Sequence, residues 1–175
     1  MAKLKPEVSD YDQSLGDPES RIVLVEFGDY QCPHCGHAHP LIKRLLRERG
    51  DDFLFVFRNF PLQESHPDAL MAAHAAEAAA KQGKFWEMHD LIFDRQNDLD
   101  ESVYDEFAEE LGLDSVQLRA DMDSDDILEK VATDFESGIR SGVNGTPTFF
   151  INGAIADYDT TYESLLKLID SRISK

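Results

Sequence analysis

Residues 21–35 read RIVLVEFGDYQCPHC, and this stretch decides the fold. Its first half is mostly apolar and rich in β-branched side chains, which predicts a buried strand over residues 21–27. A short loop follows, and a helix is expected to begin at the cysteine motif and to run to Arg49, where Gly50 ends it. Residues 53–60, FLFVFRNF, predict a second buried strand. A strand, a helix and a strand in this order indicate parallel pairing through a right-handed crossover.

Helical periodicity dominates the middle of the chain, and strands return near its end. Helices are expected at residues 67–82, 85–96, 101–111, 115–121, 126–141 and 161–173. Before the last of these, residues 148–151 and 154–156 predict strands joined by the hairpin signal Asn152-Gly153. The order of elements predicts an α/β protein with a small mixed central sheet flanked by helices.

The same pattern divides the chain into three parts. Residues 1–20 are polar and are expected to form an N-terminal arm. Residues 21–62 and 143–175 are expected to form the α/β core, and residues 63–142 an all-helical insertion between the second and third core strands. A chain of 175 residues can bury such a core without disulfide staples.

Charge and hydropathy exclude two classes of partner. The chain has 17 basic and 35 acidic residues, a net charge of −18 and a pI near 4.5. Such a field repels nucleic-acid phosphates and anionic membranes. No apolar run approaches the roughly 20 residues that span a bilayer, and no signal peptide is visible, so a cytoplasmic location is expected as the chain stands. A chain cut from a signal peptide or from a larger protein would read the same way, so a periplasmic or extracytoplasmic location is the alternative.

The two cysteines, Cys32 and Cys35, are separated by Pro33 and His34. At the start of a helix, unpaired backbone N–H groups and the helix dipole favour an anion, which lowers the pKa of the first thiol. The second thiol lies one turn further along, near enough to attack a mixed disulfide. We therefore expect Cys32 to attack and Cys35 to resolve, with Pro33 and His34 setting the redox poise. A protonated His34 would stabilise the Cys32 thiolate and make the disulfide more oxidising.

Two other roles for the cysteine pair compete with this one. Cys32, Cys35, His37 and His39 lie close together in the sequence, and sulfur with imidazole suits zinc. Structural zinc sites usually draw a second ligand pair from a distant segment, however, and no second C-x-x-C exists here. A structural disulfide across so short a loop would be strained and would gain little entropy. Redox chemistry is the favoured interpretation.

Several motifs occur in an order that resembles one protein family. They are VLVEFGDYQCPHC (23–35), RNFPL (58–62) with His66-Pro67, AAEAA (75–79), GKFWEMHDLIF (83–93) and GVNGTPTFFING (142–153). The chain resembles the DsbA-like branch of the thioredoxin superfamily, bacterial proteins with a helical insertion in a thioredoxin fold. Cys-Pro-His-Cys is the motif associated with the oxidase DsbA. The resemblance implies a thioredoxin-like fold for this chain.

The resemblance also implies roles for three further residues. Pro147 follows a Gly-Thr turn that makes it a candidate for a cis peptide bond, and it is expected to face the cysteines. Thr146 is expected to offer its backbone to an extended substrate peptide. Glu26 lies where thioredoxin-like proteins keep a buried acid that aids proton transfer at the inner cysteine; the alternative for Glu26 is an edge carboxylate facing solvent.

Thr146 is also a departure from the oxidase, which carries valine before the cis-proline, whereas disulfide isomerases tend to carry threonine. Those isomerases have an N-terminal dimerisation domain that the twenty leading residues here cannot supply, so an isomerase is not predicted. The direction of electron flow is open. We expect a monomeric thiol–disulfide oxidoreductase that acts on cysteine-containing protein substrates and an unidentified redox partner, with no cofactor and no bound metal. The alternatives are a redox-sensing or binding domain of a larger assembly, such as a transporter, and a zinc-bound structural module.

Overall fold

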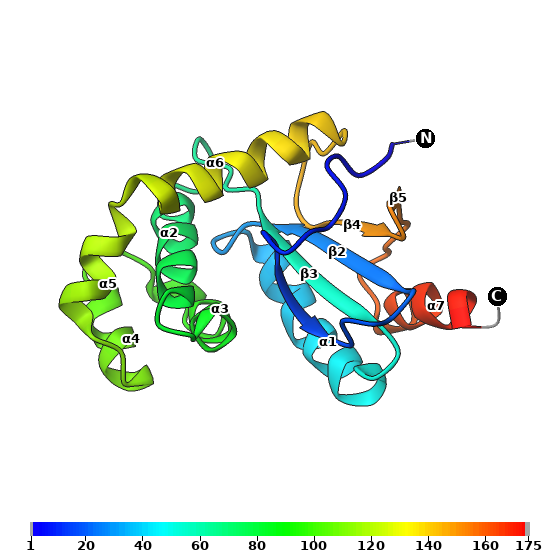
Figure 1. Ribbon diagram of the computed structural model, residues 1–175, viewed down its shortest axis with the longest axis horizontal. Helices are drawn as coiled ribbons and strands as arrows, with labels where there is room; N and C mark the ends of the chain where they lie inside the picture. Colours follow the sequence, from blue (N-terminus) through cyan, green and yellow to red (C-terminus); the bar gives the residue numbers. More distant parts are fainter. Residues whose placement is uncertain (1, 174–175) are drawn as a thin grey trace.

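The computed structural model describes residues 2–173, and within them five strands form one mixed sheet (Figure 1). The strands are β1 (Gln13–Gly16), β2 (Val23–Gly28), β3 (Leu54–Asn59), β4 (Thr148–Ile151) and β5 (Ala154–Ile155). They lie in the order β1-β3-β2-β4-β5, with β2 and β3 parallel and the other pairs antiparallel. The connection between β2 and β3 is the helix α1 (Pro33–Arg49). The predicted fold class, a thioredoxin-like α/β fold, is confirmed.

Alternate residues of β2 pack on opposite faces of the sheet, as the strand period of two requires. Leu24 belongs to the larger apolar cluster, together with side chains of α1 and of α7 (Tyr162–Ile173). Val25 and Phe27 belong to a smaller cluster on the other face, which α6 (Asp125–Arg140) covers through Phe135. Both faces of the sheet are therefore covered by helices. A residue of β2 in phase with Leu24 faces α1.

The remaining helices lie between β3 and β4 and form a unit beside the sheet (Figure 1). They are α2 (Ala69–Ala80), α3 (Phe85–Asp94), the single 3₁₀ turn η1 (Gln96–Asp98), α4 (Val103–Leu111) and α5 (Ser115–Met122). The alanine-rich α2 packs against α3, α5 and α6, and its small side chains are almost all buried. The long helix α6 then runs back from this unit to the sheet, where the ring of Phe135 stacks on that of Phe60 at 4.5 Å.

The arm expected at residues 1–20 contains a strand that the sequence pattern does not indicate. β1 pairs antiparallel with β3, with Gln13 opposite Phe57 and Gly16 opposite Leu54. Most of β1 is exposed, so this edge strand lacks the apolar alternation by which strands are recognised. Leu4 of the same arm is buried in the smaller apolar cluster. The expectation of a simple lead-in arm was therefore wrong, because these residues complete the sheet and its packing.

The second difference from the predicted elements is the end of α3, just before Gln96. The helix expected over residues 85–96 ends at Asp94, because Arg95 (φ −110°, ψ 27°) leaves the helical conformation. The turn η1 then begins at Gln96. Elsewhere the predicted strands and helices are present, with their ends moved by a residue or two. The break at Arg95 has no glycine or proline to announce it in the sequence.

Gly138 allows α6 to approach the sheet, because a Cβ there would lie 2.5 Å from Cδ2 of Phe60 and 3.2 Å from the Phe27 ring. We predict that Gly138→Ala lowers the free energy of unfolding by roughly 1–3 kcal/mol, the usual cost of overpacking a core. Urea denaturation measures the change. Gly145→Ala, whose added Cβ would meet open space, is the control. A Gly138→Ala protein as stable as the wild type would contradict this tight packing.

Candidate active site

Both cysteines lie at the N-terminus of α1, to which β2 delivers the chain. Cys32 directly precedes the helix and has an extended backbone (φ −70°, ψ 122°), and Pro33 opens the first turn, where a missing N–H is harmless. Cys35 is fully buried, and Cys32 is 4% exposed. Both are free thiols in this structure.

A buried carboxylate, Asp29, holds the loop before the helix. Its Oδ1 accepts hydrogen bonds from the backbone N–H groups of Gln31 (2.7 Å) and Cys32 (3.1 Å). Its Oδ2 accepts a hydrogen bond from the Leu62 N–H at 2.9 Å and lies 2.8 Å from Nδ1 of His66. Neither Asp29 nor His66 was expected at the site from the sequence. The available signal was an aspartate shortly before the start of a helix, a position from which its side chain can bind backbone N–H groups.

The pKa of Cys32 is lowered from 9.0 to about 5. The largest cause is a hydrogen bond from the Cys35 thiol, which outweighs the opposing effect of burial. The Thr146 side chain and the backbone N–H groups of Cys35 and His34 lower the pKa further. His34 acts here through its backbone, and its side chain is exposed. The contribution of a charged His34 imidazole stays a prediction.

Thr146 meets Cys32 across 114 residues of sequence, because the loop before β4 lies against the start of α1. The Cys32 thiol donates to the Thr146 carbonyl oxygen, with Sγ and O 3.6 Å apart. The Thr146 hydroxyl is buried and, among residues 2–173, has no hydrogen-bond partner. Once Cys32 is ionised, this hydroxyl can donate to the thiolate. The next peptide bond, Thr146–Pro147, is cis.

The pKa values of Cys35 and Glu26 are raised, whereas that of Cys32 is lowered. Burial, the hydrogen bond to Cys32 and the charge of Glu26 raise the pKa of Cys35 well above its ordinary value, while the Asp29 N–H, 3.5 Å from Sγ, lowers it. Glu26 is in phase with Leu24 on the central strand β2, so it points toward α1, and it is 3% exposed. Burial and the charge of Cys32 raise the pKa of Glu26 to about 8. The alternative of an edge carboxylate facing solvent was therefore wrong.

The four residues considered as zinc ligands do not converge among the residues that the structure describes. Nε2 of His37 lies 3.1 Å from the Thr160 carbonyl oxygen, on the surface. His39 faces the opposite way, toward α3, where its Nε2 lies 3.5 Å from Oδ1 of Asp90. Although Cys35 and His39 are one helical turn apart on α1, their side chains have different surroundings.

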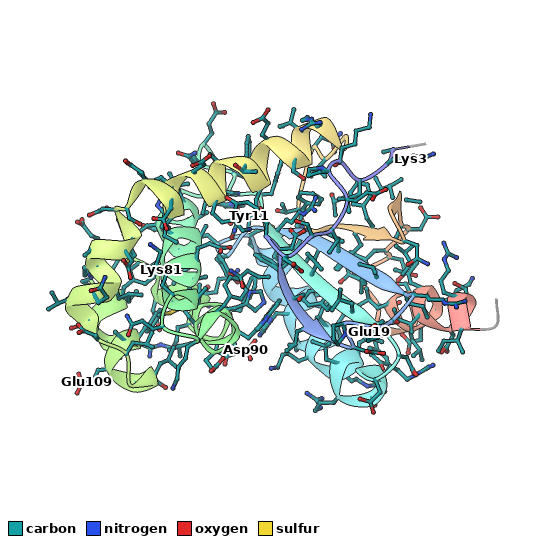
Figure 2. The ribbon with its side chains drawn as sticks, viewed as in Figure 1. Lys3, Tyr11, Glu19, Lys81, Asp90 and Glu109 are labelled. Atoms are coloured by element: carbon teal, nitrogen blue, oxygen red, sulfur yellow. The ribbon has the colours of Figure 1, made fainter. Side chains whose placement is uncertain are left out.

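His39, His89 and Asp90 do come close enough to share an ion, with ligand atoms within 4.8 Å of one another. Each is already engaged, however. Asp90, labelled in Figure 2, pairs with Lys43 of α1 at 2.6 Å, and Nδ1 of His89 lies 2.8 Å from the Tyr30 hydroxyl. Burial lowers the pKa of both imidazoles, so they are held neutral. These contacts make a polar seam that joins α1 to α3.

Comparisons with known proteins agree with this geometry. The model of the family described as Thioredoxin matches residues 9–171. The chain is 41% identical over 155 residues to the Na(+)/H(+) antiporter NhaA 1 of Mycobacterium sp. (strain KMS), a match that covers 87% of this chain and 25% of that protein. The Na(+)/H(+) antiporter NhaA 3 of Salinispora tropica is also 41% identical, over 85% of this chain and 22% of that protein. The chain thus spans about a quarter of the length of these relatives. Within residues 2–173, no helix is long and apolar enough to cross a membrane.

Solved structures share the complete fold. A thioredoxin-like oxidoreductase from Silicibacter pomeroyi DSS-3 has a TM-score of 0.83 and 27% identity, and the match covers 95% of each chain. Oxidised BdbD from Bacillus subtilis has a TM-score of 0.84 and 21% identity over 99% of each chain. The thiol–disulfide exchange protein α-DsbA2 from Wolbachia pipientis has a TM-score of 0.82 and 22% identity over 93% of this chain and 88% of its own. Because the family model matches nearly its whole length, the chain belongs to the thioredoxin family, and its helical insertion between β3 and β4 gives it the same fold as α-DsbA2 and BdbD.

Proposed function

We propose that this chain exchanges the dithiol/disulfide pair of Cys32 and Cys35 with cysteines of protein substrates. The supporting observation is the opposite shift of two neighbouring thiols: the pKa of Cys32 falls to about 5, while that of Cys35 rises well above its ordinary value. At neutral pH Cys32 is the thiolate, and a thiolate is the nucleophile in disulfide exchange. A thiol of low pKa is also the better leaving group. Cys32 therefore attacks and leaves, and Cys35 resolves.

In the oxidising direction, two electrons pass from substrate thiols to the disulfide of Cys32 and Cys35. A substrate thiolate attacks Sγ of Cys32 in the disulfide, and Cys35 leaves with the electron pair and takes up a proton. A second substrate thiolate attacks the substrate sulfur of the mixed disulfide, and Cys32 leaves as a thiolate. Two substrate thiolates become one disulfide, and the two electrons remain on the cysteine pair until a redox partner removes them. We favour this direction, because a stabilised Cys32 thiolate stabilises the reduced protein and makes its disulfide a stronger oxidant.

Glu26 fits the role of proton acceptor and donor for Cys35. It lies on the α1 face of β2, its charge acts on Cys35, and its pKa of about 8 is nearer to that of a thiol than an ordinary carboxyl pKa is. Proton transfer is efficient when the pKa values of donor and acceptor are close to each other and to the working pH. When Cys35 attacks a mixed disulfide it must lose its proton, and Glu26 is the buried base on hand.

The loop of Thr146 and Pro147 fits the role of substrate platform. It lies beside the Cys32 thiol, at the end of the sheet where β4 begins. An extended peptide can pair with exposed backbone at the edge of a strand, which brings affinity without demanding a particular side chain. A cysteine in such a peptide would lie opposite Cys32.

A second candidate is a redox domain of a larger protein. The relatives named as antiporters are about four times as long as the region that they share with this chain, and the match spans most of the present sequence. In that setting the same exchange would act on cysteines of an attached or neighbouring membrane protein. The two candidates use one chemistry and differ in the range of their substrates.

The first prediction tests the exchange itself and its range. Cys32→Ser should abolish insulin reduction and the oxidation of reduced ribonuclease, because it removes the nucleophile. Cys35→Ser should accumulate mixed disulfides through Cys32, which attacks a substrate disulfide and is not released; mass spectrometry identifies the adducts formed with disulfide-containing test proteins. Adducts with many unrelated substrates favour a general oxidoreductase, and adducts with one membrane protein favour the second candidate. Stable adducts on Cys35 in the Cys32→Ser protein would contradict the assignment of roles.

The second prediction concerns direction. In the reduced protein the pKa of Cys32 is depressed, so its ionisation adds stability that is complete above pH 9 and is lost as the pH falls to about 5. The reduced form should therefore be the more stable form at pH 7, and its advantage should shrink toward pH 5. Matched urea denaturation of the two forms measures this, with the Cys32→Ser, Cys35→Ser double variant as the control. An oxidised form that is more stable at pH 7 would favour a reductase.

The third prediction concerns Glu26. Its pKa of about 8 exceeds the ordinary 4.5, so ionising it costs stability progressively from pH 4.5 to pH 8. Glu26→Gln should leave stability unchanged below pH 4.5 and increase it above, by at most about 1.4 kcal/mol per pH unit. The same variant should slow the release of mixed disulfides. Glu64→Gln, at an exposed position, is the control, and a pH-independent effect of Glu26→Gln would contradict the raised pKa.

A further inference from the structure

The helical insertion reaches the active site through the side chain of Gln96, the first residue of η1. Its Nε2 donates one hydrogen bond to the carbonyl oxygen of Tyr30 (2.9 Å) and another to that of Cys32 (2.8 Å). Both carbonyls lie in the short segment directly before α1, two residues apart. One amide group therefore fixes the turn that carries the attacking thiol.

The Cys32 carbonyl is also the first acceptor of α1. The Gly36 N–H donates to it at 3.0 Å, so the bond from Gln96 adds a second donor to the oxygen that starts the helix. Withdrawing negative charge from this oxygen favours an anion on the same residue. Fixing the turn also keeps Sγ in line with the N–H groups of His34 and Cys35, which lower the Cys32 pKa.

Gly36 supplies an independent sign that this contact is specific. A Cβ at position 36 would collide with the Gln96 carboxamide, including its Cδ at 3.0 Å and its Nε2 at 3.1 Å. Gly36 has an ordinary helical backbone, in contrast to Gly83 and Gly112, which have positive φ. Glycine inside a helix is less favourable than alanine. A glycine at position 36 is explained by the space that the Gln96 carboxamide occupies.

The position of Gln96 is set by the insertion. Arg95 donates to Asp98 at 2.9 Å within the turn, and its N–H donates to the Leu91 carbonyl of α3 at the same distance. The neighbouring Phe93 packs on the ring of Tyr30, with centroids 4.9 Å apart. The turn η1 is thus fixed from the insertion side and presents Gln96 to the core.

We propose that Gln96 is a positioning residue for the dithiol, through which the helical insertion sets how readily Cys32 loses its proton. This inference rests on the proposed function, because the Cys32 thiolate is the reacting group. Losing the two hydrogen bonds of Gln96 raises the pKa of Cys32 and makes the disulfide less oxidising. A negative charge at the same place raises the pKa further.

The test is the Cys32 pKa, followed by thiolate absorbance at 240 nm in the reduced full chain. Gln96→Met keeps the length of the side chain and removes its hydrogen bonds, and we expect a rise of roughly half a unit. Gln96→Glu should give a larger rise. Gln117→Ala is the matched control: it removes another glutamine of the insertion that donates a hydrogen bond, to Asp121 at 2.9 Å, and it should leave the pKa unchanged.

A double-mutant cycle separates this contact from a general loss of packing. Gly36→Ala should raise the Cys32 pKa, because the added methyl displaces Gln96. In the Gln96→Ala background the same change should have no further effect on the pKa. Additive rises, or a pKa that Gln96→Met leaves within 0.1 unit of the wild type, would overturn the proposal. Absence of exchange activity in the wild type would overturn the proposed function instead, and the pKa series would still decide the role of Gln96.

Discussion

The chemistry of this site depends on the stabilisation of the Cys32 thiolate, to which the Cys35 thiol contributes most and the backbone N–H groups at the N-terminus of α1 add. A helix leaves its first N–H groups without partners, and here Cys32 sits directly before them. Pro33 lacks one of these groups, while the N–H groups of His34 and Cys35 act on the thiolate. The buried strand β2 fixes where the helix starts. The loop between them is held by Asp29 from one side and by Gln96 from the other. The fold thus holds a thiolate in place before any substrate arrives.

The same geometry creates a conflict that serves the reaction. Glu26 and Cys35 are both buried, and the charge of Glu26 helps to raise the pKa of Cys35. Burial, and after it the charge of Cys32, raise the pKa of Glu26 to about 8, so Glu26 retains its proton near neutral pH. When Cys32 is in a mixed disulfide its charge is gone, and Glu26 ionises more easily. The acid therefore becomes available to Cys35 at the step in which Cys35 must lose its proton.

The parts of this site that the sequence predicts are those encoded by local pattern or by family motif. The spacing of Cys32 and Cys35 after an apolar run places them at a strand-to-helix junction, and the family resemblance indicates Glu26 and Thr146. Gln96 and Asp29 are different, because a polar residue in a helical or loop segment looks the same whether it faces solvent or a distant carbonyl. Their roles depend on where the insertion packs, which no single segment reveals. The edge strand β1 is not predicted for a related reason: its side chains are mostly exposed, so the sequence lacks the alternation of apolar and polar residues that indicates a strand.

The acidic surface raises the question of how a thiolate persists on a chain of net charge −18. Charges beyond about 8 Å are largely screened at physiological ionic strength, so the groups in contact with Cys32 decide. Two carboxyl groups lie near Cys32 in the sequence. The oxygens of Asp29 accept hydrogen bonds from three backbone N–H groups and contact His66. Glu26 has a pKa of about 8 and is mostly neutral at pH 7. Neither repels the thiolate at full strength. An acidic protein can therefore hold a reactive thiolate. The acids nearest to Cys32 are hydrogen-bonded or protonated, and the Cys35 thiol and the backbone N–H groups of His34 and Cys35 stabilise the negative charge.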